Sequence, residues 1–388
     1  SLMTGRYPIR QGLQVGVVWP SAQFGLPLEE RTLSQALKKV GYRTIILGKW
    51  HLGEYKPEYL PLQRGFDYHY GHYLGAIDYY THSRMGGLDW HRNGQPVREE
   101  GYTTNLLAAE AVKIITKHDP AQPLFLYVPF NAVHAPLQAP QQYIDRYKHI
   151  ENKKRSIYAA MTTCMDDAIG RTLEALEKRG MAKDTLVFFA SDNGGPNRNG
   201  ANNDPLRDGK GSVYEGGIRV PAVARWPGHL KAGSVVNEPL HIVDLYPTLL
   251  KLAGASLKQR MPLDGLDAWP TIAQGSPSPH TEILHNVHPG LTRGAIRRGD
   301  WKLVIQREQA GTRIEGKKKK SAGLIELFDI TKDPGETTNL ADNYPVKVKE
   351  LMERLKFYEK QALPPKNKAK SRRRGNFKAP KVWGERNQ

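Results

Sequence analysis

The sequence predicts an α/β fold in which helices sandwich a mostly parallel sheet, followed by a smaller α+β unit. Apolar, strand-like segments alternate with helical segments between about residues 31 and 191. After about residue 255 the pattern changes to paired strand-like segments and a terminal helix. Strictly alternating strands and helices are typical of parallel sheets, because each crossover helix must pack on a sheet face.

The first 255 residues are expected to form the catalytic domain. Helices are expected at 31–42, 103–118 and 154–178, and strands at 43–48, 123–130 and 185–191. Apolar residues of the third helix recur every three or four positions, which predicts one buried face. Cys164, the only cysteine of the chain, lies in this face. It is therefore expected to be a structural thiol and not a nucleophile.

Residues 256–363 are expected to form the C-terminal subdomain. Its antiparallel strands are expected within 294–305 and 324–330, with a helix over 344–363. Residues 364–388 read as a basic, disordered tail, since nine Lys or Arg residues and one Glu lie between Leu363 and the C-terminus. No apolar run approaches the roughly 20 residues that span a bilayer.

The net charge is +18. Such a surface favours polyanions, namely nucleic acid, anionic membranes or sulfated polysaccharides. The competing interpretation, and the favoured one, is that the tail and the run Lys317–Lys320 are simply solvated. No nucleic-acid motif accompanies the charge, so no nucleic-acid partner is expected.

Ionisable and oxygen-donor side chains follow three successive strand segments and a Gly-rich loop. Because strands of an open α/β sheet bind ligands beyond their carboxyl ends, these side chains are expected at one edge. Two lysines, two histidines and an oxygen-donor pair suit a doubly charged oxyanion and a hard cation. In chain order the candidates are Lys49, His51, His134, Asp192, Asn193 and Lys210.

Each candidate has a plainer explanation when it is taken alone. Asp192-Asn193-Gly194-Gly195 can be a turn, because these residues tolerate positive φ. Lys49-Trp50-His51 can be a surface turn with a packed tryptophan. His134 can bond the loop backbone, and Lys210 can be solvated. The convergence of all of them on one sheet edge favours a site.

These segments also resemble the motifs of the sulfatase family. "SLMTGRYP" looks like the second half of the first sulfatase signature, and "GYRTIILGKWHLG" resembles the second signature. "FNAVHAP", "SDNGG" and "KGSVYEGGIRVP" follow in family order. "LPLQRGFDYHYGHYLGAIDYYTH" and "EILHNVHPG" narrow the resemblance to the arylsulfatase B-like (N-acetylgalactosamine-4-sulfatase-like) branch. Nearly the whole chain is covered, except the Lys-rich insert and the tail.

The resemblance implies an alkaline phosphatase-like fold with a mixed central sheet and a smaller C-terminal sheet. It also implies Ca²⁺ and a formylglycine, made from Cys or Ser by a formylglycine-generating enzyme. By alignment, this nucleophile and an acidic metal-binding pair belong before Ser1. The chain is therefore expected to lack its first strand and nucleophile segment, and to be inactive by itself.

The activity implied is hydrolysis of a sulfate ester. The hydrated aldehyde attacks sulfur, the alcohol leaves, and the resulting hemiester collapses. Asp192 and Asn193 match metal ligands, and Lys49 and His51 match residues that contact formylglycine. His51 is the expected base for the collapse. His134 and Lys210 match groups on the sulfate and the leaving oxygen, and either can be the general acid.

The expected substrate is a sulfated carbohydrate or an aryl sulfate. The branch suggests a 4-sulfated N-acetylgalactosamine unit. The lack of disulfide-forming cysteines favours a bacterial origin, with export to the periplasm or beyond. Two alternatives stay open: a phosphodiesterase or phosphonate hydrolase of the same superfamily, and an inactive homologue that binds sulfated polysaccharide.

Overall fold

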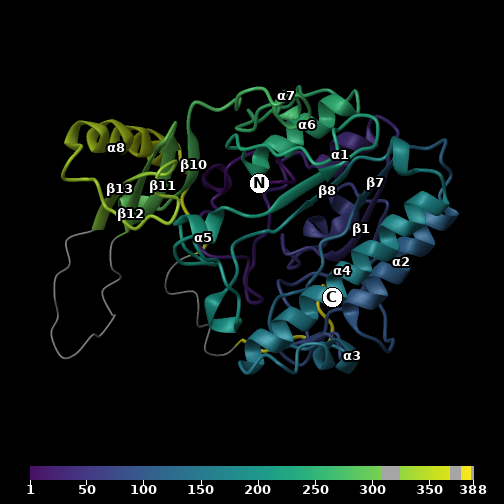
Figure 1. The fold of residues 1–388 in the computed structure, drawn as a ribbon. Helices are drawn as coiled ribbons and strands as arrows, with labels where there is room; N and C mark the ends of the chain where they lie inside the picture. The colour runs from purple at the N-terminus through teal and green to yellow at the C-terminus, as the bar shows by residue number, and fades with distance from the viewer. Residues whose placement is uncertain (307–323, 368–376, 386–388) are drawn as a thin grey trace.

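The computed structural model describes residues 1–306, 324–367 and 377–385. A larger unit contains strands β1, β7 and β8 with helices α2 and α4. A smaller unit contains β10–β13 with α8 (Figure 1). The helices are α1 (Leu33–Lys38), α2 (Thr103–Lys117), α3 (Gln141–Asp145), α4 (Lys153–Lys178), α5 (Glu215–Ile218), α6 (Leu245–Leu252), α7 (Trp269–Gln274) and α8 (Pro345–Lys360).

Within the described residues, the strands form two larger sheets and two short ribbons. Their bounds are β1 (Arg43–Lys49), β2 (Tyr68–His72), β3 (Ser83–Arg84), β4 (Gly87–Leu88), β5 (His91–Arg92), β6 (Gln95–Pro96), β7 (Leu124–Tyr127), β8 (Val187–Ala190), β9 (Ala222–Arg225), β10 (Ile283–Val287), β11 (Arg293–Arg298), β12 (Trp301–Gln306) and β13 (Leu324–Asp329).

The central sheet has the order β6-β5-β2-β1-β7. Strand β1 runs parallel to β2 and β7, whereas β5 and β6 are antiparallel. Because successive side chains of a strand point to opposite faces, β1 contacts helices on both sides. Ile45 and Leu47 pack with α2, and Ile46 packs with α1 and α6. The expected mixed sheet between helices is thus confirmed.

Strand β8 differs from the expectation of one continuous sheet. It pairs antiparallel with β9 as a separate ribbon, and no ladder joins it to β7 in the described part of the chain. Its side chains are only partly buried, and Phe189 is 37% exposed. The apolar sequence predicted this strand correctly but not its pairing.

Helix α4 forms where its apolar stripe predicts it. Asn152 caps its N-terminus by accepting a hydrogen bond from the Arg155 amide, and Gly180 takes a positive φ just past its end. Cys164 is fully buried, and burial raises the pKa of its thiol to about 11. The structural role predicted for this cysteine fits its position.

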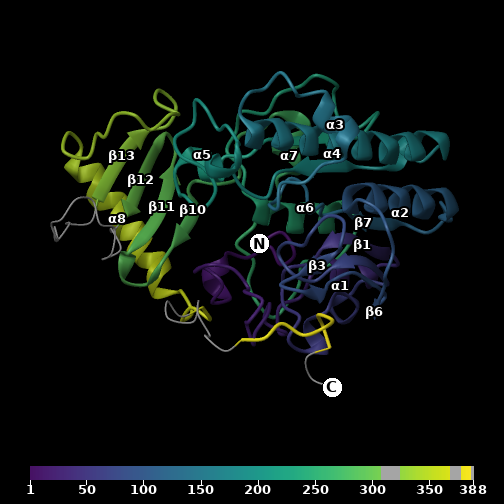
Figure 2. The ribbon, with the colours of Figure 1, turned by 90° about the horizontal axis from the view of Figure 1, so that it is seen from below.

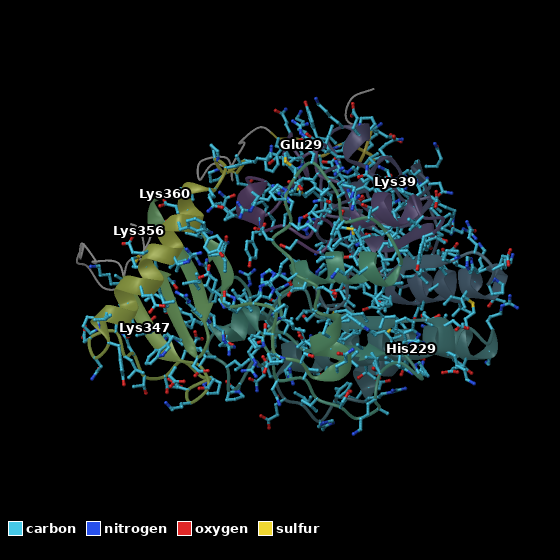
Figure 3. All side chains as sticks on the ribbon, turned by 90° about the horizontal axis from the view of Figure 1, so that it is seen from above. Glu29, Lys39, His229, Lys347, Lys356 and Lys360 are labelled. Carbon is cyan, nitrogen blue, oxygen red and sulfur yellow. The ribbon has the colours of Figure 1, made fainter. Side chains whose placement is uncertain are left out.

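The smaller unit is an antiparallel sheet of order β10-β11-β12-β13, covered by α8 through Leu351 and Leu355. Its core also takes in Tyr7, Ile9 and Val243 of the larger unit. Lysines labelled in Figure 3, namely Lys347, Lys356 and Lys360, lie along α8. The segment 256–282 still packs on the larger unit, where the rings of Trp226 and Trp269 lie 5.6 Å apart.

The tail differs from the expected disordered segment in both of its described parts. Residues 364–367 contact the loop that begins at Gly12. Residues 377–385 run along the lower edge of the larger unit in the view of Figure 2, and the Trp383 side chain is fully buried. The apolar residues Phe377, Val382 and Trp383 explain why this basic segment docks. The run Lys317–Lys320 lies outside the described residues.

Within the described ranges, none of the helices has both the length and the apolar character needed to traverse a bilayer.

Candidate functional site

Five of the six predicted site residues line one cavity of about 3120 Å³, which also reaches strands β10 and β11. They are Lys49, His134, Asp192, Asn193 and Lys210. His51 is not part of the lining, but the charges of Lys49 and His134 both influence its pKa. The charges of Lys49, Asp192 and Lys210 also influence the pKa of His134, so these residues lie near one another at the cavity.

Lys49 ends β1, and two glycines make this strand end possible. A side chain on Gly48 would lie 2.2 Å from the Pro129 carbonyl oxygen. A side chain on Gly71 would lie 2.2 Å from the Gly48 carbonyl oxygen. The Lys49 amide donates to the Pro129 carbonyl at 2.8 Å. The backbones thus approach closely, and this close approach fixes the point at which Lys49 leaves the sheet.

His51 takes a left-handed backbone conformation with a φ of 55°. Its amide donates to the Tyr73 carbonyl at 2.9 Å, and its Nε2 lies 3.1 Å from the Val18 carbonyl. A carbonyl only accepts, so Nε2 carries the proton and Nδ1 carries the lone pair. Burial, with a smaller effect of Lys49, lowers the pKa of His51 to about 3. The imidazole is therefore neutral, with its lone pair on Nδ1.

His134 follows β7 and keeps a different nitrogen protonated. Its Nδ1 donates to the Ala135 carbonyl at 2.7 Å, which leaves the lone pair on Nε2. Burial lowers the pKa of His134, and the positive charges of Lys210 and Lys49 lower it further. A hydrogen bond to the loop backbone was the alternative explanation for His134. The structure shows this bond, and His134 lines the cavity as well.

Asp192 and Asn193 follow β8 in a loop of closely packed glycines. A side chain on Gly194 would lie 1.8 Å from the Gly216 carbonyl oxygen. The Gly194 amide donates to the Gly217 carbonyl, and the Lys210 amide donates to the Gly195 carbonyl. These backbone bonds join the loop that carries Asp192 to the loop that carries Lys210. The glycines are thus required for the approach of the two loops.

The C-terminal sheet holds the Lys210 loop from the other side. Lys302 on β12 is fully buried, and its Nζ lies 2.8 Å from Glu215 Oε1 and 2.7 Å from Glu336 Oε1. The Glu215 amide donates to Glu336 Oε2 at 2.6 Å. Arg293 on β11 donates to the Gly211 carbonyl. Side chains of the smaller unit therefore position the Gly-rich loop.

The charges at the cavity act on one another. Burial lowers the pKa of Lys49, Asp192 raises it in part, and Lys210 lowers it further. Two cations that repel each other across a cavity bind an anion well, because a dianionic group relieves the repulsion.

The donor set of the Asp192 loop fits a hard cation, since it offers a carboxylate and an amide carbonyl. The Asn193 amide group currently donates to Asp192 Oδ1. In the described part of the chain, no group of three His, Cys, Asp or Glu residues is arranged to hold a metal ion. Ca²⁺ takes six to eight oxygens, so these two residues supply only part of a calcium site.

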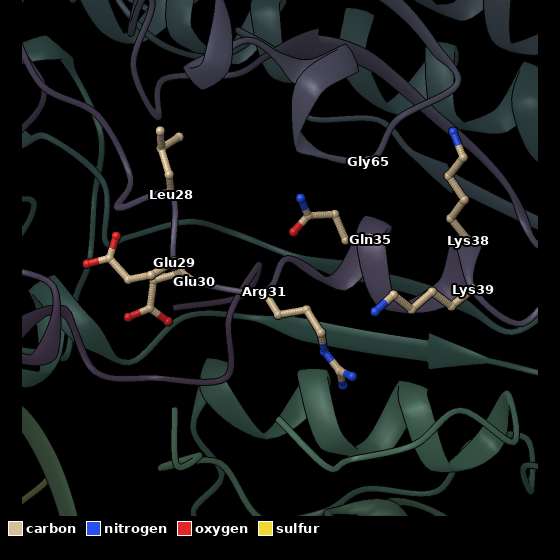
Figure 4. Close-up of a pocket in the computed structure, with 8 residues that line it drawn as sticks. All are labelled: Leu28, Glu29, Glu30, Arg31, Gln35, Lys38, Lys39 and Gly65. Carbon is tan, nitrogen blue, oxygen red and sulfur yellow. The ribbon is translucent and has the colours of Figure 1, made fainter. Parts of the chain in front are cut away.

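A second concavity of about 610 Å³ lies elsewhere on the larger unit (Figure 4). None of the six predicted site residues lines it. Its charges are mixed and largely offset one another, because Glu29 and Glu30 lie with Arg31, Lys38 and Lys39.

Sequence reasoning missed the residues that hold His51, namely Val18 and Tyr73 with Gly75. A side chain on Gly75 would lie 2.4 Å from the His51 ring. These contacts join segments far apart in the chain and have no local pattern. The apolar residues of the basic tail were a signal that could have pointed to its docking.

Comparisons with known proteins agree with this arrangement. The sulfatase family model matches residues 1–255. Mouse arylsulfatase J is 37% identical over 98% of this chain and 71% of its own length. Human arylsulfatase A is 33% identical over 92% of this chain and 76% of its own length. Mouse N-acetylgalactosamine-6-sulfatase is 31% identical over 94% of this chain and 76% of its own length.

Solved structures show the same fold. The structure of Ps i-CgsB in complex with k-i-k-neocarrahexaose superposes with a TM-score of 0.82, at 32% identity over 94% of this chain and 82% of that chain. A phosphonate monoester hydrolase of Agrobacterium radiobacter has a TM-score of 0.62 at 20% identity, over 93% of this chain and 85% of that chain, a likeness of fold alone. The arylsulfatase B-like branch stays a prediction. The family match and the named relatives show that the chain belongs to the sulfatase family and is a sulfuric ester hydrolase.

Proposed function

We propose that this sulfatase removes sulfate from a sulfated saccharide at the cavity lined by Lys49, His134, Asp192, Asn193 and Lys210. The observation that carries the proposal is the meeting of two lysines and a carboxylate-amide pair on one cavity. A sulfate ester is anionic and repels an anionic nucleophile. Lys49 and Lys210 offset this repulsion and stabilise the sulfate oxygens as charge builds up.

A formylglycine upstream of Ser1 would supply the nucleophile, and Ca²⁺ held in part by Asp192 and Asn193 would offset negative charge. His51 is assigned as the base, because its Nε2 donates to the Val18 carbonyl and the lone pair is left on Nδ1. The lowered pKa of His134 disfavours a protonated imidazole. Lys210 is therefore our choice as donor to the leaving oxygen, with His134 binding the sulfate.

We further propose that an extended segment preceding Ser1 fits between β7 and β8. In the described part of the chain, β7 is hydrogen-bonded to β1 alone and β8 to β9 alone, and both line the large cavity. Leu124–Tyr127 are apolar but only half-buried. Two unpaired, apolar strand edges at one cavity are suited to a further strand. That strand would carry the missing acidic ligands and nucleophile toward Asp192.

The substrate class is inferred from the relatives. One is named for 6-sulfated N-acetylgalactosamine, and a solved relative was crystallised with neocarrahexaose. Both support a sulfated saccharide, and 4-sulfated N-acetylgalactosamine is the unit to test first. We also propose export to the bacterial periplasm or beyond, and maturation by a formylglycine-generating enzyme.

The test uses the matured full-length protein with p-nitrophenyl sulfate, p-nitrophenyl phosphate and 4- or 6-sulfated N-acetylgalactosamine. We expect sulfate release that stops on chelation and returns with Ca²⁺. Asp192→Asn is expected to weaken the binding of Ca²⁺, measured by calorimetry. Faster cleavage of the phosphate ester than of the sulfate ester would favour the phosphate-enzyme alternative.

A further inference from the structure

The C-terminal tail touches both loops that hold His51. One loop contains Val18, whose carbonyl accepts from His51 Nε2 at 3.1 Å. The other contains Tyr73, whose carbonyl accepts from the His51 amide at 2.9 Å. The left-handed backbone of His51 is unfavourable for a residue with a side chain, so it depends on such outside contacts.

The first described part of the tail fixes the loop before Val18. Asn367 Nδ2 donates to the carbonyls of Val15 at 2.8 Å and Val17 at 2.6 Å. The Lys366 amide donates to the Gly12 carbonyl at 2.8 Å. This loop lacks regular helix or strand from residue 11 to residue 18. The tail therefore supplies partners for backbone carbonyls that secondary structure does not satisfy.

The second described part docks on β4 and the preceding turn. The Trp383 side chain is fully buried, and its Nε1 donates to the Arg84 carbonyl at 2.9 Å. The Leu88 amide donates to the Lys381 carbonyl, and the Trp383 amide donates to the Leu88 carbonyl, both at 2.9 Å. A side chain on Gly87 would lie 2.3 Å from the Pro380 carbonyl oxygen. The position of Gly87 thus requires a residue without a side chain, because the tail backbone packs directly against it.

Gly384 then reaches Tyr73 itself. A side chain on Gly384 would lie 2.8 Å from Tyr73 Cε2. The Tyr73 ring stacks between His69 at 5.1 Å and His91 at 4.2 Å. Its amide donates to Asp89 Oδ1 at 2.9 Å. Tyr73 therefore has little freedom, and the tail packs against the Cδ2 and Cε2 atoms of its ring.

We propose that the C-terminal tail is an intramolecular brace for the active site, in which Asn367 and Trp383 are positioning residues that hold His51 through Val18 and Tyr73. The inference rests on the proposed role of His51 as a base. By this inference the tail affects catalysis through its packing and not through its positive charge. A base displaced by about 1 Å can lose about a hundredfold in rate, so the brace affects turnover more than substrate affinity.

The experiment compares variants of the matured full-length enzyme. Trp383→Ala removes the buried side chain of the tail. Gly87→Val places a side chain where the tail backbone packs, while the tail itself stays unchanged. Asn367→Ala removes the hydrogen bonds to the loop before Val18. Lys381→Ala is the matched control, because its side chain is exposed in the same segment. We expect the first three to lower kcat about ten- to a hundredfold with KM within about twofold, and the control to match the parent.

Hydrogen exchange at the His51 amide gives a readout that does not need activity. We expect at least about tenfold faster exchange in Trp383→Ala and Gly87→Val, with the midpoint of global unfolding little changed. A peptide of residues 377–388 added to a chain ending at residue 376 is expected to recover kcat.

Two outcomes overturn the brace: unchanged kcat in both Trp383→Ala and Gly87→Val, or unchanged exchange at the His51 amide. They are distinct from a failure of the proposed function. In that failure the parent enzyme would release no sulfate, or His51→Asn would leave turnover unchanged.

Discussion

The two halves of the site are built in different ways. Lys49 leaves a buried strand that is paired on both edges, and its position is set by backbone packing at Gly48 and Gly71. Lys210 is exposed on a loop that is held by backbone bonds to Gly195 and by side chains of the smaller unit. The comparison teaches that the smaller unit is a structural part of the site.

The largest expected effect concerns the support of the Lys210 half. Lys302→Met leaves Glu215 and Glu336 as buried carboxylates without their cation. We expect a loss of about 3–5 kcal/mol in the free energy of unfolding, measured with denaturant. The control Lys349→Ala, exposed on α8, should stay within about 0.5 kcal/mol.

A triple variant separates charge from packing in this prediction. Adding Glu215→Gln and Glu336→Gln to Lys302→Met removes the uncompensated carboxylates. Stability should recover in large part. If it does not, the loss comes from the shape of the lysine and not from its charge.

The next effect concerns Lys210 itself. Lys210→Ala should lower turnover of p-nitrophenyl sulfate by about a factor of 10² to 10³, because a charge that stabilises the transition state is lost. Unfolding should shift by less than about 0.5 kcal/mol, since this side chain is exposed. Equal turnover in variant and parent would remove Lys210 from the site.

On the Lys49 half, the expected effect is one of backbone strain. Gly48→Ala places a side chain 2.2 Å from the Pro129 carbonyl oxygen at a φ of 127°. We expect a loss of about 1–3 kcal/mol in thermal or denaturant unfolding. Gly170→Ala is the matched control, because the same change in α4 meets open space and should stabilise the helix by up to about 1 kcal/mol.

The last effect is an acid dependence that lies mostly in the larger unit. Burial lowers the pKa of His69 to about 3 and those of His72 and His241 to about 4. In the unfolded chain these groups take up protons below about pH 6.5. The contribution of these neutral histidines to the free energy of unfolding is therefore complete above about pH 6.5. It falls as the pH drops toward about 4, by up to about 1.4 kcal/mol per pH unit for each histidine.

His69→Leu tests this dependence. The slope of unfolding free energy against pH between about 6 and 4 should decrease by the contribution of one histidine, up to about 1.4 kcal/mol per pH unit. An unchanged slope would mean that His69 is protonated in the folded state.

The sequence predicted the parts of the molecule that local patterns encode. The stripe of α4, the strands β1, β7 and β8, and the polar residues after each strand follow from hydrophobic periodicity and chain order. Pairing between β8 and β9, and its separation from β7, depends on contacts between distant segments. Periodicity carries no information about such contacts, so these features were not predicted.

The same distinction holds within the site. Lys49, Asp192 and Lys210 were found because they follow strands or lie among glycines. Val18 and Tyr73 were missed because a carbonyl that accepts from a histidine leaves no mark in the residue type. The docking of residues 377–385 was not predicted because the charges of the tail outnumber its few apolar residues, one of which is the fully buried Trp383.

The buried amine of Lys302 has a practical consequence for protein engineering. The family match ends at residue 255, which invites truncation there. A protein cut at that point would keep Glu215 and lose its counterion, and would expose Tyr7, Ile9 and Val243 to water. Such a product should aggregate on expression, so any minimal enzyme must retain the sheet that supplies the missing cation.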